Sequence, residues 1–262
     1  MAADPAATAS PVFSCRGVHY AYHDRFPALA GVTLDVAPGE RVALLGANGC
    51  GKSTLLKVLS GLLFPTAGSV AAFGRPLTED ALEDEQFSRA FRSRVGIVFQ
   101  NSDAQLFTPT VAEEVAFGCL QLGLARDETR ARTDDVMSML GIADLAERAP
   151  FQLSAGQKKK VALASVLVMN PDVLLFDEPT AALDPRTQRW LTDLVVELGD
   201  TGKTIVLATL DLGELELLAD RALVFAEDHT LVADAAPAEI LADRDLLLSV
   251  NLIHARTRLP GR

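Results

Sequence analysis

Residues 41–63 read Arg-Val-Ala-Leu-Leu-Gly-Ala-Asn-Gly-Cys-Gly-Lys-Ser-Thr-Leu-Leu-Lys-Val-Leu-Ser-Gly-Leu-Leu, and this segment is the strongest indication of the fold class. The apolar run Arg41 to Leu45 predicts a buried strand, and the leucines of Thr54 to Leu63 follow at helical spacing. Between them, residues 46–53 match the pattern G-x-x-x-x-G-K-[ST] in the strand–loop–helix context that it requires. We therefore predict a phosphate-binding loop whose backbone N–H groups surround the phosphates, with Lys52 on the β- and γ-phosphates and the Ser53 hydroxyl on Mg²⁺. A chance glycine-rich turn would match this pattern in roughly one such chain in a hundred.

Further strand-like runs extend this unit into a sheet. The runs are Val95 to Phe99, Val173 to Phe176 and Thr204 to Leu210. Their nearly continuous Val, Leu and Ile content is typical of strands that are covered on both faces, which predicts an α/β fold with a parallel sheet.

Helical patterns lie between and after these strands. Asp184-Pro185 predicts the start of one helix and Gly199 its end, by N-cap, N1 and C′ chemistry. The strand signal fades over residues 100–153, where we expect an inserted helical subdomain. A helical pattern returns over residues 237–253 before a basic tail.

The composition excludes several classes of protein. The chain has 262 residues, of which 49% are hydrophobic and 23% charged, so a globular core is expected and extensive disorder is excluded. Its 24 basic and 35 acidic residues give 24 − 35 = −11, which opposes binding to nucleic acid. Three widely spaced cysteines fit reduced thiols better than a disulfide framework. The sequence shows no secretion signal and no run of about 20 apolar residues, so we expect a soluble and at most peripheral protein.

Two other motifs carry polar groups suited to phosphate chemistry. The strand Val173 to Phe176 ends in Asp177 and Glu178, where Asp177 would hold the Mg²⁺ shell and Glu178 would polarise an attacking water. Ser154-Ala155-Gly156-Gln157 begins a helix, whose free N–H groups favour anions. Taken alone, each motif fits a plain helix cap better; beside a phosphate loop, the Asp-Glu pair favours catalysis. The lysines 158–160 that follow are interpreted as a solvated helix start.

In order and spacing, these motifs resemble the nucleotide-binding subunit of ATP-binding cassette (ABC) transporters, over about Val12 to Ala236. The resemblance implies a P-loop NTPase of ABC type, with a RecA-like core, an antiparallel β subdomain and an inserted helical subdomain at about 100–153. The expected domains are a disordered N-terminus over 1–11, an ATPase domain over 12–236 and a C-terminal helical tail over 237–262.

The same resemblance implies a role for each motif residue, with ATP and Mg²⁺ as ligands. ATP would be bound by an aromatic platform for adenine and by the phosphate loop: Tyr22, Gly46, Ala47, Asn48, Gly49, Cys50, Gly51, Lys52, Ser53 and Thr54. Mg²⁺ would be bound by Ser53, Gln100 and Asp177, while Glu178 and Gln100 would act on the attacking water. The signature Ser154, Ala155, Gly156 and Gln157, with Ala155 where the family usually has glycine, would cover the ATP of a second ATPase subunit. Asp184, at the end of Ala181-Ala182-Leu183-Asp184, would lie in the loop that faces this subunit. By themselves, Tyr22 and Gln100 fit a strand tyrosine and an ordinary loop residue, and Asp184 fits a helix N-cap.

One position departs from the family pattern. A histidine normally follows the strand Thr204 to Thr209 and donates a hydrogen bond to the γ-phosphate, whereas this chain has Leu210. Leucine has no donor, and the loss of one such transition-state contact costs about 10²- to 10³-fold in rate. We therefore expect the chain to bind MgATP and to hydrolyse it slowly.

A finer resemblance narrows the subfamily. Residues 99–107 and 115–118, with Gln157-Lys158-Lys159, resemble the ATPases of energy-coupling-factor importers, and Asn251-Leu252-Ile253-His254 is similar to their cobalt and nickel branch. The resemblance implies an ATPase on the cytoplasmic face of the membrane that contacts, through the region Gln100 to Leu122, a transmembrane scaffold with a substrate-binding membrane component. The four histidines form no pattern of metal ligands, so the transported ion is expected to bind elsewhere.

Other functions stay open at this stage. The ATPase could serve an importer of a vitamin or another small solute, since the fold alone does not choose the solute. Cassette ATPases of translation or DNA repair are disfavoured by the single cassette and the acidic pI near 4.8. A regulatory ATP-binding module without turnover would fit Leu210 but not the intact Glu178.

Overall fold

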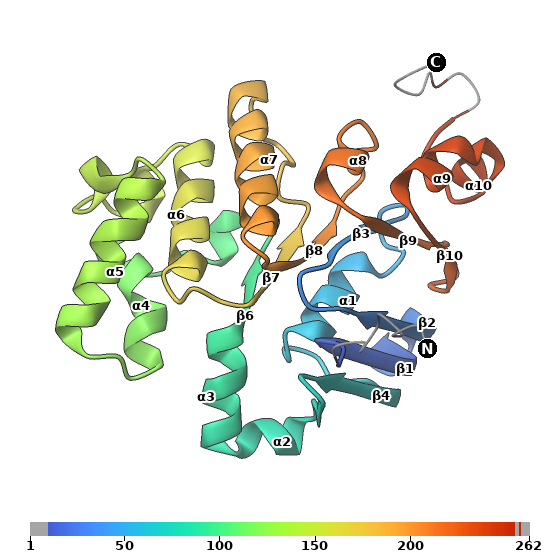
Figure 1. The fold of residues 1–262 in the computed structure, drawn as a ribbon, viewed down its shortest axis with the longest axis horizontal. Helices are drawn as coiled ribbons and strands as arrows, with labels where there is room; N and C mark the ends of the chain where they lie inside the picture. Colours follow the sequence, from blue (N-terminus) through green and yellow to red (C-terminus); the bar gives the residue numbers. More distant parts are fainter. Residues whose placement is uncertain (1–9, 255–256, 258–262) are drawn as a thin grey trace, which may run out of the picture.

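The centre of the computed structural model, which describes residues 10–254 and residue 257, is a six-stranded sheet (Figure 1). Its strand order is β10-β9-β3-β8-β7-β6, in which β10 is antiparallel and the other neighbours are parallel. The strands are β3 (Arg41–Leu45), β6 (Val95–Val98), β7 (Val173–Asp177), β8 (Thr204–Ala208), β9 (Arg221–Phe225) and β10 (Leu231–Ala235). The predicted parallel sheet is confirmed, although β8 ends at Ala208, before Leu210.

Both faces of this sheet are covered, which explains the apolar character of its strands. Along β7, Leu174 and Phe176 belong to the apolar cluster of the later helices, whereas Leu175 belongs to the cluster around α1. Figure 1 shows α6, α7 and α8 on one face and α1 with a smaller sheet on the other. Because successive strand side chains point to opposite faces, each strand needs apolar residues throughout.

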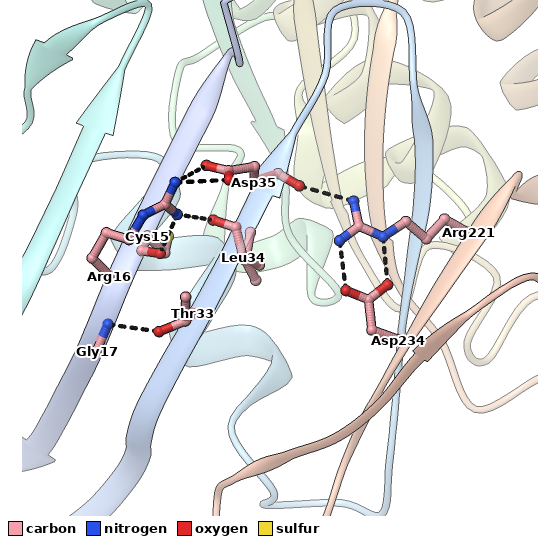
Figure 2. Close-up of polar contacts among 8 residues, drawn as sticks. All are labelled: Cys15, Arg16, Gly17, Thr33, Leu34, Asp35, Arg221 and Asp234. Atoms are coloured by element: carbon pink, nitrogen blue, oxygen red, sulfur yellow. Dashed lines mark hydrogen bonds and ion pairs between the residues drawn. The ribbon is translucent and has the colours of Figure 1, made fainter.

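The smaller sheet is antiparallel, as predicted, with the order β2-β1-β4-β5. Its strands are β1 (Phe13–Tyr22), β2 (Phe26–Val36), β4 (Ala67–Ala72) and β5 (Arg75–Pro76). Arg221 of β9 joins the two sheets, since it donates to the backbone oxygen of Asp35 at 2.9 Å and forms an ion pair with Asp234 of β10 (Figure 2). Asp35 in turn pairs with Arg16 of β1. These contacts fix the small sheet against the edge of the large one.

The helices follow the predicted pattern with some differences. They are α1 (Lys52–Leu59), α2 (Glu79–Glu83), α3 (Glu85–Arg94), α4 (Val111–Gln121), α5 (Arg126–Met139), α6 (Ala155–Leu167), α7 (Pro185–Asp200), α8 (Leu215–Leu218), α9 (Pro237–Ala242) and α10 (Arg244–Ser249), with 3₁₀ turns η1 (Ser102–Ala104), η2 (Ala143–Leu145) and η3 (Pro150–Gln152). Helices α4, α5 and α6 pack against one another, so the helical packing continues past the predicted boundary at residue 153.

Two details differ from the sequence-based expectations, and a third expectation falls on residues that the structure does not describe. Helix α7 continues to Asp200, because Gly202, with φ 84°, and not Gly199 takes the left-handed conformation after the helix. Helices α2 and α3 were not predicted, although Thr78 and Asp84 cap them with side-chain hydrogen bonds. The predicted disordered N-terminus lies outside the described residues except for Ser10 and Pro11, as do tail residues 255–256 and 258–262.

Within the described chain, none of the helices has the length and apolar character that crossing a bilayer demands.

Candidate nucleotide-binding site

The phosphate loop connects β3 to α1 at the carboxyl end of the sheet. Lys52 is 4% exposed, and its Nζ donates to the backbone oxygens of Gly46 at 2.7 Å and Ala47 at 3.2 Å, so its own loop encloses the ammonium. Gly46 has φ 140°, and a Cβ there would lie 2.6 Å from the Phe225 oxygen, so only glycine fits. The residue before α1 is Gly51, which has no side chain to accept from the first N–H groups of the helix. Such groups form a site for anions.

The hydroxyl of Ser53 meets the carboxylate of Asp177 at the end of β7. Ser53 Oγ donates to Asp177 Oδ1 at 2.7 Å, and Asp177 is 7% exposed. Mg²⁺ prefers a small number of hard oxygen ligands together with substrate phosphates. A hydroxyl and a carboxylate beside a phosphate loop fit this ion, with Ser53 and Asp177 as the residues that would hold it.

Glu178 lies between the phosphate loop and the loop after β6. Its Oε2 accepts a hydrogen bond from Gln100 Nε2 at 3.1 Å, and its Oε1 lies 3.8 Å from Lys52 Nζ. The backbone of Glu178 has φ 41°, and its N–H donates to Ala208 O at 3.0 Å. A left-handed backbone at a glutamate is strained, and such strain is concentrated at functional sites. The structure thus brings Lys52, Gln100 and Glu178 together.

Tyr22, at the end of β1, approaches the first turn of α1. Its hydroxyl lies 3.3 Å from the hydroxyl of Thr54, and its ring meets Tyr20 edge to face with centroids 5.0 Å apart. Because Tyr22 is partly buried and Thr54 directly follows Ser53, the ring lies beside the phosphate loop. This place suits a stacking platform for a base.

The signature residues Ser154–Gln157 form the capped start of α6, a helix that packs against several other elements. Ser154 Oγ accepts from the Gln157 N–H at 3.4 Å, and Gln157 Oε1 accepts from the Ser154 N–H at 2.9 Å, which forms a capping box. Helix α6 packs against α4, α5 and β6. Within the described residues, no hydrogen bond or ion pair connects Ser154–Gln157 to the phosphate loop of the same chain.

Asp184 and Leu210 are both exposed. Asp184 caps α7 by accepting from the N–H groups of Arg186 and Thr187, and a further hydrogen bond from the Thr187 hydroxyl at 2.6 Å lowers the pKa of its carboxyl. Leu210 is 39% exposed and stands two residues after Ala208, which holds the Glu178 N–H. Its apolar side chain offers no hydrogen bond to any ligand near Glu178.

Sequence reasoning missed Lys159. The prediction of a solvated start for Lys158–Lys160 is wrong at this residue, because Lys159 is 2% exposed and its Nζ donates to Phe99 O at 3.0 Å and Gln100 O at 3.1 Å. Burial lowers the pKa of Lys159 to about 8. The helical period gives the missed signal, because residue 159 shares a face of α6 with the buried Leu163 and Val166.

One histidine contacts the phosphate loop: His229 Nδ1 lies 3.3 Å from the backbone oxygen of Cys50. Among the described residues, no group of three or more His, Cys, Asp or Glu side chains is placed to hold a metal ion.

The chain is similar to known proteins in sequence and in overall structure. The family model described as ABC transporter matches residues 29–181. The chain is 47% identical to the nickel import ATP-binding protein NikO of Rhodobacter capsulatus, over 93% of this chain and 96% of the relative. It is 41% identical to the energy-coupling factor transporter ATP-binding protein EcfA of Methanothermobacter thermautotrophicus, over 92% and 76%. A solved dimeric structure of the ATP-binding cassette MJ0796 in a post-hydrolysis state, bound to ADP and Pi, is similar with a TM-score of 0.75 and 28% identity, over 86% of this chain and 98% of that one.

Proposed function

Since the chain belongs to the ABC transporter family, as an ATP-hydrolysing subunit of an importer, we propose that it energises an energy-coupling-factor importer for nickel or cobalt. The similarity to NikO over 93% of the chain supports nickel as the transported metal, and the similarity to EcfA over 92% supports the energy-coupling-factor type of importer. The observation that carries the chemistry is Glu178, held between Gln100 and Lys52. The proposed location is the cytoplasmic face of the membrane.

The site residues divide the proposed hydrolysis among them. The loop N–H groups and Lys52 would bind the phosphates, Ser53 and Asp177 would hold a Mg²⁺ that neutralises phosphate charge, and Tyr22 would stack on the adenine. Glu178 accepts a proton from the attacking water, which Gln100 orients through its amide. In this arrangement the negative charge that develops on the γ-phosphate lies beside the Lys52 ammonium.

We propose that two ATPase subunits complete each other's sites. Among the described residues, the signature at the start of α6 makes no hydrogen bond or ion pair with its own phosphate loop, and Ser154 and Ala155 are exposed there. The dimeric form of the similar cassette MJ0796 supports the pairing. The signature of one subunit would thus contact the ATP of the other.

The proposed surface for the transmembrane partner is a groove between α4 and α5. The groove has a volume of about 930 Å³, and its lining combines apolar residues, among them Phe117, Leu120 and Met137, with charged ones, which are Glu113, Arg126, Arg130, Asp134 and Glu147. Phe107, 67% exposed, meets Phe117 edge to face at its rim, with ring centroids 4.9 Å apart. Exposed apolar side chains that are surrounded by polar residues in this way are typical of a protein interface. The residues of the groove follow the loop after β6 in the chain, and Gln100 of that loop donates a hydrogen bond to Glu178. A membrane partner that binds the groove can therefore shift Gln100 relative to Glu178.

The direct test is ATP-dependent uptake of labelled nickel and cobalt in cells or vesicles that contain this chain and its membrane partners. We expect uptake of at least one ion, and none with Glu178→Gln. Uptake of a vitamin in place of either metal would favour the alternative solute and overturn the proposed substrate. A chain without ATPase activity even in its complex would overturn the mechanism.

A further inference from the structure

The loop after β6 is attached to α6 along its length. Lys158 Nζ lies 2.6 Å from Asp103 Oδ1, and Gln105 Nε2 donates to Ala162 O at 2.9 Å. Gln105 also accepts from the Phe99 N–H at 3.2 Å, which closes the loop on itself. The loop that carries Gln100 therefore lies against the helix that carries the signature.

Lys159 is the buried member of this attachment. At 2% exposure its ammonium has exchanged water for two backbone oxygens, those of Phe99 and Gln100. An ammonium needs such partners when it is buried, and an apolar residue would fill the same place without that need. A buried cation on consecutive carbonyls fixes the orientation of the peptide between them.

The fixed peptide is the one that aims the Gln100 side chain. The backbone oxygen of Gln100 accepts a hydrogen bond from Lys159. The side-chain amide of the same residue, which is exposed, donates from Nε2 to Glu178 Oε2 at 3.1 Å. A rotation of the peptide at 99–100 would move this amide away from the carboxylate. Displacements of about 1 Å in such groups can cost up to about 10²-fold in rate.

From these contacts we propose that Lys159 is a positioning residue for ATP hydrolysis, which holds the loop after β6 so that Gln100 meets Glu178. This inference rests on the proposed catalytic role of Glu178 and Gln100. By these proposals, the first turn of α6 contacts the nucleotide of the second subunit, and its second turn positions Gln100 in the site of the same subunit.

The test compares Lys159→Met, which has a similar length and no donor, with Lys159→Gln, which is neutral and keeps two N–H donors. Lys158→Met is the matched control, because it lies on the same helix and bonds to Asp103 in the same loop. All variants are made in the full chain and also in a Leu210→His background, so that low basal turnover does not hide the effect. We measure kcat, KM for ATP, binding of a fluorescent ATP analogue, and backbone hydrogen exchange over residues 99–105.

We expect Lys159→Met to lower kcat about 10-fold or more with KM and analogue binding within about 2-fold, because only positioning is lost. Lys159→Gln should recover part of kcat, and Lys158→Met should stay near the parent chain. Exchange at residues 99–105 should rise in Lys159→Met, a readout that does not depend on turnover. Combined with Gln100→Ala, Lys159→Met should lower kcat no further, since both changes act through the same contact.

An unchanged kcat in Lys159→Met, or a multiplicative loss in the double variant, would overturn the proposal. If Lys159→Met does not fold, Lys159→Gln decides by the same kcat and double-variant criteria. The proposed function would be refuted if neither the unmutated chain nor the Leu210→His chain hydrolysed ATP. The inference about Lys159 would be refuted if Lys159→Met left backbone hydrogen exchange over residues 99–105 unchanged.

Discussion

Replacement of Leu210 by histidine should raise ATP hydrolysis. Leu210 follows β8, whose last residue, Ala208, accepts a hydrogen bond from the Glu178 N–H at 3.0 Å, so position 210 is two residues from the strand end that bonds to the proposed catalytic residue. The loop around it is fixed, because the Asp211 N–H donates to the Thr209 hydroxyl at 3.0 Å and the Gly213 N–H donates to Asp211 Oδ1 at 2.7 Å. A new side chain at 210 therefore leaves the backbone in place.

The size of the effect follows from one added donor. A histidine N–H that meets the γ-phosphate only as charge develops is worth about 10²- to 10³-fold in kcat, ~3–4 kcal/mol. The parent leucine is 39% exposed, so its replacement should change the free energy of unfolding by no more than about 0.5 kcal/mol. KM for ATP should change little, because the loop N–H groups and Lys52 bind the ground state.

The assay is steady-state release of phosphate from MgATP by the purified full chain, with Glu178→Gln as background. Leu210→Ala is the matched control, since it removes the leucine without supplying a donor and should stay at the parent rate. Equal rates for the parent and Leu210→His, both well above the Glu178→Gln background, would contradict the reasoning. So would a gain in Leu210→Ala as large as that in Leu210→His, which would point to steric relief.

Three further predictions rest on separate observations. Cys50 is 2% exposed, and burial raises the pKa of its thiol. At pH 7.5 a thiol reagent should therefore label Cys50 far more slowly in the folded chain than in denaturant, and MgATP should slow the labelling further. Fast labelling that leaves the affinity for ATP unchanged would contradict the proposed role of the phosphate loop. Phe107 lies at the rim of the α4–α5 groove, so Phe107→Asp should abolish co-purification with the membrane partner and leave the ATPase rate of the isolated chain unchanged. Co-purification that persists in this variant would exclude the groove as the docking surface. The hydrogen bond from Arg16 lowers the pKa of Asp35, so this pair stabilises the fold above the unfolded pKa of about 4 and the contribution disappears as pH falls through the folded value. Asp35→Asn should therefore flatten the fall of Tm below about pH 4, and an unaltered fall would show that the pair contributes nothing.

Local sequence patterns predicted the parts of the site that are made locally. The phosphate loop is eight consecutive residues, and its glycines and lysine act through their own backbone, so the pattern contains the geometry. The contact between Gln100 and Glu178 joins residues 78 positions apart and exists because β6 lies next to β7 in the sheet. Strand order is a property of the packed sheet, so only the family resemblance, and not the spacing, could anticipate that contact.

Lys159 was missed for a different physical reason. Three consecutive lysines indicate a solvated segment by composition, but a helix turns 100° per residue and cannot expose three neighbours equally. Lys158 pairs with Asp103, Lys160 lies over the Trp190 ring at 4.6 Å, and Lys159 points into the protein. The helical period, applied residue by residue, would have identified the buried one.

The capping box at Ser154 is compatible with a nucleotide contact in a second subunit. A serine hydroxyl has one hydrogen and two acceptor lone pairs. The bond from the Gln157 N–H uses a lone pair, so the hydrogen stays available to a phosphate oxygen. The 13 residues of α6 add the positive end of their dipole at the same point. Because Ser154 is exposed and α6 packs on α4, α5 and β6, we infer that this phosphate belongs to another chain, and the cap keeps the hydroxyl in position until that chain arrives.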